Sequence, residues 1–98
     1  MTKKHFCLKL IPARPTFAQD MTEAEREIMQ KHVVYWKELM DQGLVIVFGP
    51  VSDPAGTYGL GIVEVENEEL LKSMTENDPA SSINHYEIYP MRAITPQK

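Results

Sequence analysis

Two residues of this sequence have side chains suited to moving a proton on a small molecule. His32 lies on an apolar helical stripe, one turn from both Ile28 and Trp36, where a histidine is more often a satisfied core residue than a catalyst. Asp78 precedes Pro79, where aspartate is a common turn former. A carboxylate that accepts a hydrogen bond from one ring nitrogen would leave the other nitrogen as a general base. Spacing alone leaves open whether the two side chains meet.

Two glycines indicate room beside that histidine. Gly59 and Gly61 lie two apart in a predicted strand, so they share a face with Val63 and Val65, which we expect to be the face toward the helices. Glycine weakens the interior of a strand and is tolerated where another group must approach the backbone closely. A substrate pocket under the helix and tight packing of helix on sheet both satisfy this pattern.

Two further side chains are candidates for binding a substrate. Arg14 is held between Pro12 and Pro15 and could clamp a carboxylate, although a solvated surface arginine is the commoner case. Tyr35 adjoins the apolar stripe, where its hydroxyl could donate a hydrogen bond to substrate or serve packing alone. Cys7 lies within a predicted strand, where we expect a buried structural thiol rather than a nucleophile.

Four stretches have the composition and alternation of β-strands. They are predicted at residues 5–11, 44–48, 57–66 and 85–91. Gly49 and Pro50 are expected to end or bend the second strand, and a turn joins it to the third as a hairpin.

Two helices are predicted between these strands. Thr22 and Glu25 form a capping box that starts a helix running to about Gln42, where a glycine follows. Asn67 caps a shorter helix that must end before Pro79. The resulting order is βαββαβ. It predicts an α+β, ferredoxin-like fold, a four-stranded antiparallel sheet with two helices on one face.

Composition limits the class of protein. A chain of 98 residues, 43% hydrophobic and 24% charged, fits a single domain spanning 1–98. The formal charge of −4 disfavours nucleic acid and anionic lipid, and no apolar run approaches the roughly 18 residues of a membrane span. With one cysteine and no signal peptide evident, a cytoplasmic location is expected.

Zinc and RNA are the other ligands weighed. The three histidines show no spacing typical of a zinc site. The βαββαβ order also builds the RRM, and residues 56–63 faintly echo its third-strand motif. The leading Lys or Arg of that motif is absent and its central aromatic position holds Leu60, so neither zinc nor RNA is expected.

A series of short motifs resembles the YciI-like (YCII-related) family over nearly the whole chain. They are His32 followed by Tyr35-Trp36-Lys37-Glu38-Leu39, then Gly43, Phe48-Gly49-Pro50-Val51, Gly59-Leu60-Gly61 and Asn77-Asp78-Pro79-Ala80. The resemblance implies membership of the dimeric α+β barrel superfamily, with His32 and Asp78 as a catalytic dyad. It further implies a homodimer and a small, often aromatic-derived substrate, without metal or organic cofactor. The loop 13–22 is longer than in the smallest members, so the substrate's identity is not transferred.

These observations predict a cofactor-independent lyase or isomerase. A His–Asp dyad without a nucleophile suits isomerisation or elimination, such as dehydrochlorination, better than acyl transfer. The alternative is a non-catalytic module that binds or senses a small ligand through the same pocket. Apolar residues on the uncovered face of the sheet predict a homodimer packed sheet to sheet.

Overall fold

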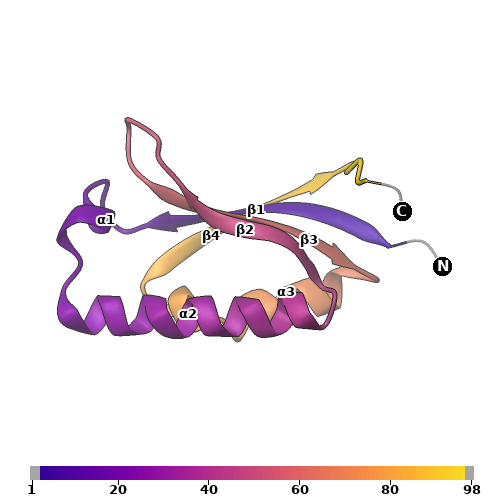
Figure 1. The fold of residues 1–98 in the computed structure, drawn as a ribbon, viewed down its shortest axis with the longest axis horizontal. Helices are drawn as coiled ribbons and strands as arrows, with labels where there is room; N and C mark the ends of the chain where they lie inside the picture. The colour runs from indigo at the N-terminus through magenta and orange to yellow at the C-terminus, as the bar shows by residue number, and fades with distance from the viewer. Residues whose placement is uncertain (1–2, 97–98) are drawn as a thin grey trace.

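A computed structural model describes residues 3–96 of the chain, and Figure 1 shows its arrangement. The strands are β1 (Lys4–Pro12), β2 (Val45–Val51), β3 (Tyr58–Val65) and β4 (Asn84–Met91). The helices are α1 (Phe17–Asp20), α2 (Glu23–Asp41), α3 (Glu68–Glu76) and a 3₁₀ turn, η1 (Pro79–Ser82). The strands form one antiparallel sheet in the order β2-β3-β1-β4, and α2 and α3 lie on the same face of it (Figure 1). The predicted α+β, ferredoxin-like fold is confirmed.

Helix α2 begins and ends where the sequence predicts. The Thr22 hydroxyl accepts from the Glu25 amide at 3.1 Å, and the Glu25 carboxylate accepts from the Thr22 amide at 2.9 Å, which completes the capping box. Gly43 follows the C-cap with φ of 81°, a conformation that glycine adopts without strain. The helix is thus fixed at both ends by local chemistry.

Strand β2 is longer than predicted. It continues through Gly49 and Pro50 to Val51, with Pro50 opposite Gly59 of β3, so the expectation that the strand ends at Phe48 is wrong. The reason is position, because β2 lies at an edge of the sheet. An edge strand has only one neighbouring strand, so the N–H that proline lacks is not needed for a second one.

Two short elements were not predicted from the sequence. Helix α1 forms within the loop that joins β1 to α2, and η1 forms between α3 and β4. Each is only four residues long, which is too short for a helical periodicity to be recognised. Both turn out to lie next to residues of the candidate site.

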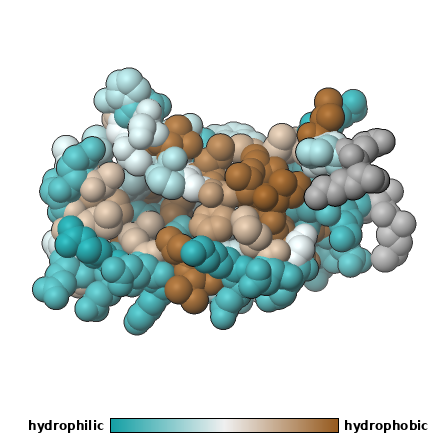
Figure 2. Space-filling view, viewed as in Figure 1, coloured by the Kyte–Doolittle hydropathy of each residue, from teal (hydrophilic) through white to brown (hydrophobic). Residues whose placement is uncertain are grey.

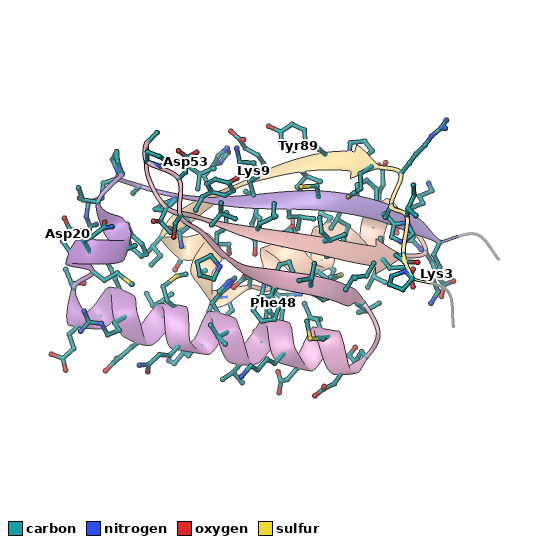
Figure 3. The ribbon with its side chains drawn as sticks, turned by 45° about the horizontal axis from the view of Figure 1, so that its top comes forward. Lys3, Lys9, Asp20, Phe48, Asp53 and Tyr89 are labelled. Atoms are coloured by element: carbon teal, nitrogen blue, oxygen red, sulfur yellow. The ribbon has the colours of Figure 1, made fainter. Side chains whose placement is uncertain are left out.

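The main core lies between the sheet and the two long helices. Its buried members come from β1, β2, β3, α2 and α3: Phe6, Leu8, Trp36, Leu39, Val45, Val63, Val65, Leu71 and Met74. Phe48 of β2 packs against this core, on the side of the sheet that faces α2 (Figure 3). Gly61 and Val63 are buried on the same side, as the strand pattern predicts.

The other face of the sheet carries no helix (Figure 1). Lys9 and Tyr89 point away from the helices on that side (Figure 3). Cys7 pairs with Tyr89 across β1 and β4 and is only half-buried, so the expectation of a fully buried thiol is wrong. None of the helices in the described part of the chain is long and apolar enough to cross a membrane.

Candidate active site

The structure brings His32 and Asp78 into contact. His32 faces inward from the middle of α2, and Asp78 follows the end of α3 directly before η1. The Nδ1 atom of His32 lies 2.9 Å from Oδ1 and 2.8 Å from Oδ2 of Asp78, so the ring N–H donates to the carboxylate. The side chains are 11% and 0% exposed, respectively. The pair is therefore almost fully removed from solvent.

Asp78 accepts from three further donors. The Ala80 amide donates to Oδ1 at 2.9 Å, and the indole N–H of Trp36 donates to Oδ2 at 2.8 Å. The hydroxyl of Tyr86 also donates to Oδ2, and accepts from Trp36 Nε1 at 3.2 Å. These partners come from α2, η1 and β4, so both carboxylate oxygens are fixed from three directions. We call His32, Trp36, Asp78 and Tyr86 the buried cluster.

The local sequence explains how the carboxylate reaches this position. Asp78 adopts an extended backbone, with φ of −71° and ψ of 125°, as the following proline requires. Pro79 occupies the first position of η1, and the Asp78 side chain caps that turn through the Ala80 amide. The turn-forming role and the contact with His32 are thus served by the same carboxylate.

The environment sets the protonation states of Asp78 and Tyr86. Burial by itself raises the pKa of Asp78, but hydrogen bonds from His32, Tyr86 and the Ala80 amide outweigh it and hold the pKa below its usual range. Burial and the bond to Asp78 raise the pKa of the Tyr86 hydroxyl. At neutral pH, Asp78 is therefore an anion, and Tyr86 is a neutral phenol that donates a hydrogen bond to it.

A cavity of about 210 Å³ opens beside this cluster. Its lining is almost wholly apolar and includes Leu10, Phe17, Met29, Val33, Phe48 and Pro50. The walls come from β1, α1, α2, β2 and β3, and Figure 2 shows hydrophobic side chains gathered between α2 and the strands above it. The volume exceeds the roughly 150 Å³ that accommodates benzene in an engineered protein cavity. One six-membered ring with small substituents therefore fits.

His32 is the link between the cluster and the cavity. His32, Trp36 and Tyr86 line the cavity, whereas Asp78 lies behind them. With Nδ1 bound to Asp78, the second ring nitrogen, Nε2, makes no hydrogen bond to any residue between 3 and 96. A hydrogen bond between His32 and a molecule in the cavity therefore has to use Nε2.

The two strand glycines differ in how closely a neighbouring side chain approaches them. A Cβ on Gly61 would lie 2.7 Å from Cζ3 and 2.9 Å from Cη2 of Trp36, so this glycine lets the indole pack against the sheet. A Cβ on Gly59 would lie 3.3 Å from Cβ of Leu10, a milder contact. Both glycines also line the cavity. Tight packing and pocket formation, which the sequence left as alternatives, both occur.

Arg14 does not line the cavity. Its guanidinium donates to Asp20 at 2.7 Å through Nε, and to Glu25 at 3.0 and 2.8 Å through its two terminal nitrogens. These contacts, which we call the loop cluster, tie α1 to the start of α2. The bonds from Arg14 and from the Thr22 amide lower the pKa of Glu25 to about 2. Clamping a substrate carboxylate would require Arg14 to exchange these partners.

Tyr35 also lies outside the cavity lining. Its hydroxyl donates to the carbonyl of Met74 at 2.7 Å, which joins α2 to α3. Burial and the charge of Asp78 raise its pKa. In this structure, the hydroxyl supports the packing of the two helices.

The sequence does not predict that Trp36 and Tyr86 donate to Asp78. The helical spacing predicts Trp36 on the apolar stripe, and nothing in that pattern shows that its N–H contacts Asp78. Tyr86 lies opposite Leu10 of β1, on the face of the sheet that looks toward the helices. Alternation along β4, together with its place beside β1, was the available signal. Within residues 3–96, no group of three or more His, Cys, Asp or Glu side chains is arranged to hold a metal ion.

Comparison with known proteins agrees with the fold. Residues 6–95 match the profile of the YCII-related domain. A solved structure of similar fold is the 5-chloro-2-hydroxyhydroquinone dehydrochlorinase TftG of Burkholderia phenoliruptrix AC1100, in complex with 2,5-dihydroxybenzoquinone. The alignment has a TM-score of 0.62 and 20% identity, and covers 89% of this chain and 93% of that chain. No curated protein sequence matches the chain.

Proposed function

Because the chain belongs to the YCII-related domain family, we propose that it is a small-molecule enzyme in which His32 and Asp78 form a dyad for acid–base catalysis. One observation carries this proposal. A buried carboxylate holds Nδ1 of His32 and leaves Nε2 without a partner among the described residues, and His32 lines an apolar, ring-sized cavity. The proposed reaction class is isomerisation or elimination, such as dehydrochlorination.

The proposed chemistry assigns one task to each member of the pair. Nε2 of His32 takes a proton from the bound molecule, and Asp78 stabilises the imidazolium that results. In an isomerisation, the same proton returns at another atom. In a dehydrochlorination, the electron pair left behind forms a new double bond as chloride departs, so that HCl is lost overall. The apolar walls strengthen the attraction between Asp78 and the imidazolium of His32, because they keep the local dielectric low.

Acyl transfer is a poorer fit to the same geometry. It needs a nucleophile beside the histidine. Among the described residues that line the cavity, there is no serine and no cysteine, and Thr57, which does line it, makes no hydrogen bond to His32. Cys7 lies on β1, where it pairs with Tyr89 on the face of the sheet without helices. The proposal is therefore restricted to proton transfer without a covalent intermediate.

The test is turnover of a chlorinated hydroxyquinol. The probe is 5-chloro-2-hydroxyhydroquinone, on which the structural neighbour acts by its name, and the readout is release of chloride. We expect His32→Gln to lower kcat by about 10²- to 10⁴-fold, the usual contribution of a general base. The matched control is His85→Gln, an exposed histidine on β4, which should leave kcat unchanged.

A ligand-binding or regulatory module remains the alternative to an enzyme. If the wild type binds the probe but releases no chloride, and does not exchange its carbon-bound hydrogens for solvent deuterium, the dyad is not catalytic for this class. Equal affinity of the wild type and His32→Gln would then assign the cavity to binding alone.

We also propose that the helix-free face of the sheet is the interface of a homodimer. Across that face, Ile62, Cys7 and Tyr89 lie side by side in register, and Val47 adjoins Ile62 from β2. Val47 and Tyr89 are exposed large apolar side chains. Burial of such a row in a second copy removes apolar surface from water.

Two pairs of polar side chains on this face are already formed within the chain. His5 Nε2 lies 2.9 Å from Glu64, and the Tyr89 hydroxyl donates to Glu87 at 2.9 Å. Pre-paired charges lower the desolvation penalty of closing a second sheet over them. This feature favours an interface over a solvated surface.

Analytical ultracentrifugation at micromolar concentration tests the dimer. We expect the wild type to sediment as a dimer and Ile62→Glu as a monomer, because the new charge would be buried between the sheets. The control is Val34→Glu, at an exposed position on α2, which should stay dimeric. A monomeric wild type would contradict the proposal.

A further inference from the structure

One polar side chain on the cavity wall has a hydrogen-bonding atom without a partner. Asn84, the first residue of β4, lines the cavity, and its Oδ1 is buried and accepts from no described residue. Among the described residues, this is the one buried side-chain oxygen or nitrogen left in that state. The amide nitrogen donates to the sulfur of Met29 at 3.4 Å.

Such an atom calls for an explanation. Buried polar groups in native proteins are almost always paired, and a thioether sulfur is only a weak acceptor. An unpaired carbonyl is unfavourable in an apolar wall, and a leucine of similar size would avoid it. Retention of an amide here is consistent with a partner that is supplied from outside the chain.

The position of Asn84 places it beside His32. Asn84 and Tyr86 lie two apart on β4, so both face the helices. Asn84 contacts Met29, and Tyr86 contacts Trp36, so two cross-links from β4 reach α2 on either side of His32. Met29 and His32 are three residues apart, which places their Cβ atoms about 5–6 Å from each other. One six-membered ring can span that interval.

The charge of the lining indicates what kind of molecule fits. No lysine or arginine is found among the described residues of the cavity wall, and Arg14 is held by Asp20 and Glu25. A carboxylate or phosphate would therefore enter without a lysine or arginine as its counter-charge, close to the anionic Asp78. A neutral molecule meets no such penalty.

We propose that Asn84 is a specificity-determining residue, and that the cavity selects a neutral, ring-sized molecule whose hydroxyl donates a hydrogen bond to Asn84 Oδ1. The terminal torsion of an asparagine side chain is soft, so a small rotation turns Oδ1 toward the cavity. A second polar group on the same ring then reaches Nε2 of His32. Only this last point rests on the proposed function, because the contact with Asn84 requires no reaction.

The experiment compares phenol with anisole. The two rings differ by one methyl group, which removes the hydroxyl donor and keeps the oxygen. Affinities for the ¹⁵N-labelled wild type and variants are obtained from NMR titrations. We expect the wild type to prefer phenol by about fivefold to tenfold, the usual worth of one neutral hydrogen bond. Asn84→Leu should lose this preference and keep its affinity for anisole.

Two controls separate specificity from structural damage. Thr57→Val changes another polar residue of the cavity wall and should keep the preference for phenol. Asn84→Leu removes an unpaired buried oxygen, so its midpoint of urea unfolding should equal or exceed that of the wild type. A lower midpoint would assign Asn84 to structure and overturn the proposal.

Three other outcomes would overturn the inference about Asn84. Equal binding of phenol and anisole to the wild type, or no binding of either, overturns the inference. Persistence of the preference in Asn84→Leu does the same. If the preference is lost in His32→Gln instead, the hydroxyl is held by His32 alone. In that case, the inference about Asn84 fails while the proposed catalytic function stands.

Discussion

The loop cluster and the buried cluster are both built around one charged side chain with several hydrogen bonds, yet they differ in what they leave free. Arg14 directs all its bonds to Asp20 and Glu25 near the surface and borders no cavity. Asp78 is fully buried and engages only one nitrogen of His32, a residue that lines the cavity and whose other nitrogen bonds to none of residues 3–96.

The difference underlies the roles that we propose, structural for Arg14 and catalytic for His32 and Asp78. An exposed ion pair is screened by water and contributes little to stability. A buried carboxylate with several donors is strongly coupled to its partners, because removal of one partner leaves the others unpaired. Charge and hydrogen bonds alone therefore do not identify a site, and the proposal depends in addition on an unused ring nitrogen of a residue that lines a cavity.

The largest predicted effect is that of Asp78→Asn. The carboxamide offers one oxygen and one NH₂ group, and either orientation turns the NH₂ group toward donors that now bond the carboxylate. We expect a loss of about 3 kcal/mol in the free energy of unfolding, measured with urea. The ring ¹⁵N shifts of His32 should also show a mixture of tautomers. Asp20→Asn is the control and should lower the free energy of unfolding much less. Equal losses in the two variants would contradict the difference between the clusters.

The next prediction compares two tyrosines on β4. The hydroxyls of Tyr86 and Tyr89 both donate to a carboxylate, Asp78 in the buried cluster and Glu87 on the exposed face. We expect Tyr86→Phe to destabilise by about 2 kcal/mol, as for a buried hydrogen bond to a charged group. Tyr89→Phe should change stability little. Chemical denaturation of both variants gives the comparison, and a larger effect at Tyr89 would refute it.

Gly61→Ala tests whether the position of Trp36 matters to the buried cluster. The added methyl would overlap the indole, which is held by Asp78 and packs against Phe48 at a ring-centroid distance of 5.6 Å. We expect a loss of about 1–3 kcal/mol, typical of overpacking. Gly59→Ala is the milder control. Thermal unfolding ranks the two, and a reversed order would show that the indole can move freely.

The smallest effect is expected from Glu25→Gln, and it depends on pH. The pKa of Glu25 is lowered to about 2 from an ordinary 4.5, first by the bond from Arg14, so the ionised form is favoured by folding. Its contribution is complete above pH 4.5 and is lost as pH falls toward 2. The variant should therefore lose less stability across this window than the wild type. Calorimetry at stepped pH measures this, with the exposed Glu27→Gln as control; parallel curves for wild type and Glu25→Gln would contradict it.

Local signals in the sequence predicted much of the fold. The caps formed by Thr22 and Asn67 are recognisable because each bonds an amide three residues away. The extension of β2 past Pro50 was not predictable in this way, because it depends on the strand being at an edge. Edge position is a property of the assembled sheet and has no local sequence signature.

The candidate site was predictable only in part, for the same reason. The helical position of His32 predicted that its side chain faces the core. The family resemblance supplied Asp78 as its partner. The role of Tyr86 depends on the register of β1 with β4, which periodicity does not contain. Arg14 could have been assigned to structure, since the carboxylates of Asp20 and Glu25 follow it closely along the chain.

The bonds to Asp78 have a consequence for the order of folding. His32 and Trp36 are 46 and 42 residues away along the chain, while Tyr86 is 8 residues away. The carboxylate thus joins the first half of the chain to the second, and loops of this length close before the bonds can form. A partly folded chain that has made α2 already contains the histidine, but its ring has no fixed tautomer. The bond that fixes the tautomer of His32 therefore appears only with the complete tertiary structure.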